Sequence, residues 1–127
     1  MENRLKLIGL PYDLSVCRVP DLCGIDLSAG FFFIGRTDEE ISLVCETEAV
    51  PENALVREDG WRGFRVGGIL DFSLTGILAG ISAVLAENRV GIFAVSTYNT
   101  DYILVKARDF DRAGEALEKA GYEIGRE

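Results

Sequence analysis

Apolar and polar residues follow a strand–helix pattern that is clearest in the second half of the chain. From Leu74 onward, apolar side chains recur at helical spacing, which predicts a helix that ends near Asn88. Asp109 precedes a second amphipathic stretch, and Gly121 is placed to end it. Strands are predicted at residues 64–70, 90–95, 102–105 and 122–124. This order is that of the ferredoxin-like sandwich, in which two helices cover one face of an antiparallel sheet.

The first half of the chain has weaker patterns. The composition changes to Glu, Thr, Pro, Asn and Gly over residues 46–63, and we place a junction between two halves there. Residues 20–30 hold aspartates and glycines at short spacing and predict a loop. Strands are predicted at residues 4–9, 14–19, 31–34 and 41–45.

Composition narrows the classes of function. The 127 residues include 21 acidic and 13 basic side chains, so the net charge is -8 and nucleic acids and anionic membranes are repelled. We predict a soluble protein, since no apolar run approaches the roughly 20 residues of a membrane span. The start of the chain has no basic segment followed by an apolar core, so we expect a cytoplasmic location.

The inventory of reactive side chains argues against catalysis. There is no histidine, which excludes Ser-His-Asp and Cys-His mechanisms and the usual imidazole metal sites. The loop residues Asp21, Cys23 and Asp26 lack a recognised metal spacing, and the two aspartates disfavour a reactive thiolate. The sequence therefore predicts a protein that is not an enzyme and has no cofactor or metal.

The polar corner at residues 95–102 is the strongest candidate site. Its sequence, Val-Ser-Thr-Tyr-Asn-Thr-Asp-Tyr, places hydroxyl, amide and carboxylate groups between two predicted strands. A simple hairpin turns with fewer such groups, so these side chains either bond their own backbone or hold a ligand.

A family resemblance arises from two segments. Residues 70–79, Leu-Asp-Phe-Ser-Leu-Thr-Gly-Ile-Leu-Ala, together with the strand–corner–strand of residues 95–105, resemble small bacterial proteins built from two ACT domains. These proteins are similar to half of the CASTOR arginine sensors and, more remotely, to the regulatory domains of aspartate kinases. The resemblance implies an α+β fold of two ferredoxin-like (βαββαβ, ACT-type) subdomains with antiparallel sheets. They would be residues 1–59, a degenerate domain with reduced helices, and residues 60–127.

The resemblance also implies a binding site, because ACT domains bind amino acids where two copies meet. The positions that match the ligand-holding turn of the sensors are Leu70, Asp71, Phe72 and Leu74. Thr97 and Asp101 match sensor residues that face the ligand from the corner. The sensors have a glycine at the position of Asp71 and an acidic residue at that of Leu74, so arginine is not the ligand that we expect.

Elementary chemistry supports the same site. A free amino acid presents a carboxylate, which the backbone N–H groups at the start of a helix that begins at Ser73 would bind. Its ammonium group needs an oxygen partner, and Asp71 or Asp101 could serve. Each side chain also has a purely structural explanation, since Asp71 and Ser73 are common helix caps and Asp101 could close its own turn.

The sequence thus predicts a regulatory, allosteric sensor of a free amino acid whose identity is open, acting as a homodimer. The alternative is a protein–protein interaction module that oligomerises without a ligand. Neither the regulated partner nor the pathway can be named from the sequence.

Overall fold

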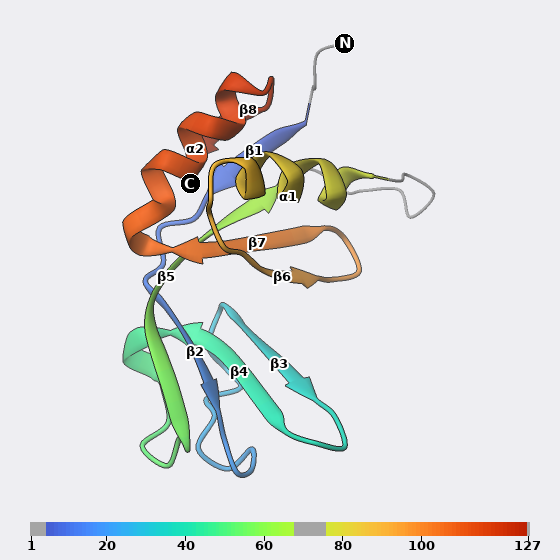
Figure 1. The fold of residues 1–127 in the computed structure, drawn as a ribbon. Helices are drawn as coiled ribbons and strands as arrows, with labels where there is room; N and C mark the ends of the chain where they lie inside the picture. The colour runs from blue at the N-terminus through green and yellow to red at the C-terminus, as the bar shows by residue number, and fades with distance from the viewer. Residues whose placement is uncertain (1–4, 68–75, 127) are drawn as a thin grey trace. The chain divides into compact units, whose positions relative to one another are not determined.

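The computed structural model describes residues 5–67 and 76–126, which its contacts divide into two units (Figure 1). Unit 1 combines the residues up to Pro11 with those from Arg62 onward, and unit 2 comprises Tyr12–Trp61. The division falls inside one strand, β5 (Val56–Val66). The N-terminal strand lies in unit 1, although the sequence placed it in the domain of residues 1–59.

Unit 1 consists of a five-stranded sheet segment and two helices. The strands lie in the order β6–β7–β5–β1–β8. The new elements are β1 (Lys6–Gly9), α1 (Ile77–Glu87), β6 (Phe93–Ser96), β7 (Asp101–Lys106), η2 (Ala107–Asp109), α2 (Phe110–Lys119) and β8 (Glu123–Arg126).

The prediction of purely antiparallel sheets is wrong for unit 1. Strand β1 lies between β5 and β8, antiparallel to β5 with Leu7 opposite Val66, and parallel to β8 with Leu7 opposite Ile124. The parallel pairing of β1 with β8 makes the sheet mixed. Strand β1 comes from the start of the chain and separates β5 from β8, two strands of the second half.

The two helices bury the faces that their spacing predicts. Helix α1 buries Ile81 and Leu85, and α2 buries Phe110, Ala113 and Leu117. These side chains share one core with apolar residues from β1, β5 and β7, and each large aliphatic side chain removed from water stabilises the fold by about 1.5–3 kcal/mol.

The helix ends agree with the sequence at three of four positions. Helix α1 ends at Asn88, Asp109 is the N-cap residue of α2, and Gly121 follows α2 with a φ of 103° that favours glycine. The exception is the start of α1, whose N-cap is Gly76 in the left-handed conformation, with φ 78°. The predicted caps, Asp71 and Ser73, lie outside the described residues.

Unit 2 is an antiparallel sheet in the order β3–β4–β2–β5, in which β2 pairs with β4 and β5 rather than with β3. Its residues 12–61, all of which the structure describes, contain one 3₁₀ turn and no α-helix, so the reduction of helices predicted for the first half is observed there. Its elements besides the start of β5 are β2 (Leu14–Arg18), β3 (Phe32–Arg36), β4 (Ile41–Glu46) and η1 (Thr47–Ala49).

Strand β5 corrects the predicted junction at residues 46–63, whereas it agrees with the predicted strand at residues 64–70 as far as Val66. Residues 68–70 lie outside the described residues. Strand β5 spans Val56–Val66 and therefore passes through the polar stretch that we had assigned to a connection. A change of register opposite Leu14 and Val16 and a φ of 84° at Gly60 let the strand bend without ending. Its first five residues are all exposed and do not alternate between buried and exposed positions. The sequence therefore did not mark them as a strand.

A polar network holds β5 to β2 at this irregularity. Ser15 is fully buried and donates a hydrogen bond of 2.5 Å from Oγ to Asp59 Oδ1. Arg57 donates to the same oxygen from Nε at 3.1 Å and Nη2 at 3.0 Å. The bond from Ser15, followed by those from Arg57, lowers the pKa of the Asp59 carboxyl group.

The network predicts a stability that depends on pH. Because the folded state lowers the pKa of Asp59, its contribution is present above the unfolded value of about 3.9 and is lost as the pH falls through the lower folded value. Asp59→Asn should lower the urea midpoint most at neutral pH, and the difference from the native protein should shrink as the pH falls from 6 to about 3. Asp38→Asn, in an exposed turn, is the control; a difference for Asp59→Asn that is constant with pH would contradict the prediction.

Candidate functional site

The turn between β6 and β7 gathers the two described residues of the predicted site. Ser96 and Asp101 pair across the strand ends. The Thr97 amide donates to the Thr100 carbonyl at 2.8 Å, and Thr97 Oγ1 lies 3.2 Å from that carbonyl oxygen and 3.4 Å from the Thr100 nitrogen. Thr97 therefore closes its own turn, and its contact with a ligand stays a prediction.

Asp101 is half-buried at the start of β7 and keeps part of its carboxylate available. Its Oδ1 accepts a hydrogen bond of 2.7 Å from Ser96 Oγ. Its Oδ2 accepts no hydrogen bond from the described residues, and a carboxylate oxygen can accept two. Asp101 can therefore accept a further donor, such as an ammonium group, without losing its bond to Ser96.

Thr100 is the residue of this corner that the sequence analysis did not single out. It is 5% exposed, and its Oγ1 donates a hydrogen bond of 2.8 Å to the carbonyl of Val66, the last residue of β5. This bond fastens the corner to the end of β5. Nothing in the local sequence distinguishes Thr100 from Asn99, because the partner lies 34 residues away.

The bond from Thr100 also relates the corner to the second predicted group of ligand residues. Leu70, Asp71, Phe72, Ser73 and Leu74 lie outside the described residues. The residues that flank this segment are described: Val66 accepts the bond from Thr100, and α1 begins at Ile77. In Figure 1 the β6–β7 turn and the start of α1 lie at the same end of unit 1. The corner thus lies beside the strand end from which the predicted binding turn departs.

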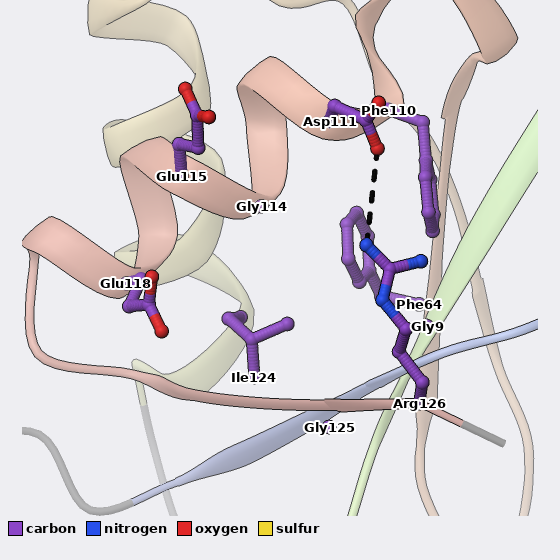
Figure 2. Close-up of a pocket in the computed structure, with 10 residues that line it drawn as sticks. All are labelled: Gly9, Phe64, Phe110, Asp111, Gly114, Glu115, Glu118, Ile124, Gly125 and Arg126. Carbon is purple, nitrogen blue, oxygen red and sulfur yellow. Dashed lines mark ion pairs between the residues drawn. The ribbon is translucent and has the colours of Figure 1, made fainter.

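A separate cleft, which the sequence analysis missed, lies between α2 and β8 (Figure 2). We call it the α2–β8 cleft; its volume is about 390 Å³. The stacked rings of Phe64 and Phe110, with centroids 4.6 Å apart, form one part of its wall. None of the residues predicted from the sequence lines it. Its lining residues are Gly9, Phe64, Phe110, Asp111, Gly114, Glu115, Glu118, Ile124, Gly125 and Arg126.

The charged groups of this cleft are mainly acidic. Asp111, Glu115 and Glu118 stand at intervals of four and three residues on α2 and are exposed. Asp111 forms an ion pair with Arg126, with Nη2 3.9 Å from Oδ1 (Figure 2). The spacing of the three acids around Gly114 was visible in the sequence, but only the position of β8 shows that they border a cleft.

The two buried thiols of unit 2, Cys17 and Cys45, are poor nucleophiles. Burial raises the pKa of both, that of Cys45 to about 12. In the loop, Asp21 accepts a hydrogen bond from the Cys23 amide and Asp26 accepts two from Ser28, so both aspartates stabilise turns.

Metal-binding groups and membrane-spanning helices are absent from the part of the chain that the structure describes. No group of three or more potential ligands there could hold a metal ion. No helix within residues 5–67 and 76–126 combines the length and apolarity that a membrane crossing requires.

Comparison with known proteins gives a family match. The family model of the ACT domain matches residues 56–119, which include β5, both helices and the β6–β7 corner. Human CASTOR3P is 31% identical over 91 residues, which are 62% of this chain and 56% of the human protein. The chain thus covers little more than half the length of that relative.

Solved structures give the same fold. A protein from Agobacterium tumefaciens matches with a TM-score of 0.86 and 32% identity, over 98% of this chain and 95% of the other. The regulatory subunit of aspartate kinase from Thermus thermophilus matches with a TM-score of 0.64 and 9% identity, over 94% and 97% of the two chains. Aspartate kinase from Clostridium acetobutylicum matches with a TM-score of 0.66 and 14% identity, over 91% of this chain and 34% of the enzyme. The two kinase matches show a common fold alone.

The attachment of the corner to β5 can be tested by substitution. Thr100→Val removes a buried hydrogen bond and leaves the Val66 carbonyl without its donor, so it should lower the free energy of unfolding by roughly 1–2 kcal/mol. Urea unfolding measures the change. Thr97→Val, at an exposed position, is the control and should cost less than about 0.5 kcal/mol. Equal losses for the two variants would contradict the role assigned to Thr100.

Proposed function

The chain belongs to the ACT domain family, and from this premise we propose that it is a non-catalytic regulatory module that binds a free amino acid. The observation that carries the proposal is the match over residues 56–119, because it includes both segments predicted to form the site. The Thermus thermophilus relative is itself a regulatory subunit. The site would lie where two ACT domains meet, and the protein would act in the cytoplasm.

The described part of the site supports this chemistry. No side chain among the described residues caps the N-terminus of α1, so backbone N–H groups of its first turn would be available to a carboxylate. Asp101 has a carboxylate oxygen available to the ammonium group. The residues Leu70–Leu74, which connect these two groups along the chain, are proposed to contribute the rest of the site.

The proposal includes a homodimer of two-domain chains. Residues 60–127 would form one ferredoxin-like domain, and residues 1–59 would form a degenerate one apart from β1, which belongs to the sheet of the first. Because ACT domains bind ligands between copies, the second chain would complete the pocket and a bound amino acid would strengthen the pairing.

We expect an amino acid to stabilise the protein against heat. A ligand at about 100 times its dissociation constant adds roughly 2.7 kcal/mol to the free energy of unfolding, which is a shift of several degrees for a protein of this size. A thermal-shift screen of the common amino acids measures it, and light scattering follows the dimer. A monomer at micromolar concentration that responds to no amino acid would count against both the pocket and the dimer.

The role of Asp101 in ligand binding can be tested separately from its contribution to stability. Asp101→Asn keeps an oxygen that accepts the bond from Ser96. The free energy of unfolding of the unliganded variant should therefore lie within about 0.5 kcal/mol of that of the native protein. It removes the charge that faces the ammonium group, and the dissociation constant for the amino acid should rise about tenfold or more. Asp38→Asn is the control for a change of one charge in an exposed turn. An unchanged affinity would remove Asp101 from the site.

A further inference from the structure

We propose that the α2–β8 cleft is the docking site of an extended basic segment of a partner protein. The segment would pair with the open edge of β8 and direct a lysine or arginine side chain to the carboxylates of Glu115 and Glu118. This surface is separate from the amino-acid site proposed above and does not depend on it.

The first argument is the position of β8 in the sheet. It is the last strand in the order of unit 1, and within the described residues it pairs with β1 alone. Its outer edge therefore presents backbone N–H and C=O groups to a further strand. Ile124 and Arg126 alternate along β8 and both line the cleft, so side chains of an added strand would alternate toward the same face.

The second argument is charge complementarity. Asp111, Glu115 and Glu118 occupy one side of α2, and like charges four residues apart destabilise a helix. Arg126 pairs with Asp111, whereas Glu115 and Glu118 form no ion pair with any residue that the structure describes. One or two cations from a partner would neutralise these two carboxylates, and the net charge of -8 would attract a basic segment from a distance.

The third argument is that the cleft already accommodates a guanidinium group. The Arg126 side chain lies 3.9 Å from Asp111 and 6.0 Å from the centroid of the Phe110 ring, while 71% of it remains exposed (Figure 2). A second guanidinium, that of Arg62, lies 4.1 Å from the same centroid. The combination of an aromatic wall and carboxylates suits a basic side chain, because its apolar stem can pack on the ring while its charged end pairs with a carboxylate.

The fourth argument is Gly114, in the middle of α2. Glycine destabilises a helix interior relative to alanine, and here the backbone is helical with no positive φ that would require it. A Cβ atom at this position would lie 3.8 Å from the Phe64 ring, an ordinary contact. The fold alone therefore gives no reason for glycine, whereas the missing methyl group keeps the cleft open beside the ring.

A blocked peptide tests the proposal. The probe is a short peptide of alternating threonine and arginine, acetylated and amidated at its ends, and its control has citrulline in place of arginine. Blocked ends exclude the probe from a site that recognises a free carboxylate and ammonium. We expect fluorescence anisotropy to show binding of the arginine peptide and at least tenfold weaker binding of the citrulline peptide.

Paired variants locate the binding. Glu115→Gln with Glu118→Gln should weaken peptide binding about tenfold, whereas Glu39→Gln with Glu40→Gln, an equal change of charge in the β3–β4 turn, should change it less than about twofold. Gly114→Ala should raise the melting temperature and weaken peptide binding, a pair of effects that a damaged fold cannot give. The thermal response to amino acids should be the same in all these variants.

Three outcomes would overturn the proposal. They are the absence of peptide binding to the native chain, equal weakening by the two double variants, and binding that Gly114→Ala leaves unchanged. If the Glu115 and Glu118 variants instead altered the dimer without any peptide binding, the cleft would be assigned to a second copy of the chain.

Discussion

The pairing of β1 between β5 and β8 is the interaction on which unit 1 depends. Leu7 is fully buried and lies opposite Val66 on one side and Ile124 on the other. Backbone bonds continue the pairing beyond the strand, from Gly67 to the Lys6 carbonyl at 2.7 Å and from Glu123 to the Leu5 carbonyl at 3.0 Å. Strand β1 thus satisfies the edges of two strands that would otherwise be open. It also separates β8 from β5, and β8 forms the edge of the sheet, where β8 and α2 border the cleft.

Local patterns in the sequence predicted those elements that are specified by residues close together in the chain. The helical spacing of apolar residues gave both helices, and Gly121 and Asn88 marked their ends, because these signals lie within a few residues of one another. The first part of β5 was hidden, since Arg57 and Asp59 bond each other, and Asp59 also bonds Ser15, instead of alternating with buried residues. The partners of β1 could not be read from the sequence, because the pairing joins opposite ends of the chain.

The candidate site was predicted in part: the corner was found from the sequence, whereas the role of Thr100 and the cleft were not. The polar composition of the corner pointed to Thr97 and Asp101, and the structure gives both of them turn bonds while leaving one oxygen of Asp101 available. It gives the structural role to Thr100, whose bond to Val66 depends on the tertiary fold. The cleft required the fold as well, since its lining residues come from β1, β5, α2 and β8.

The insertion of β1 has a consequence for how the chain folds during synthesis. Unit 2 is one continuous segment, so it can fold once its last residue leaves the ribosome, whereas β1 precedes unit 2 and meets β8 only after all the residues between them have been made. At about 5–20 residues per second, unit 1 stays incomplete for several seconds, and contacts between such distant residues slow folding further. During that interval the apolar face of β1, including Leu7, has no partner in β8. An unpaired apolar strand favours aggregation, so the nascent chain is vulnerable at β1 until β8 has been made.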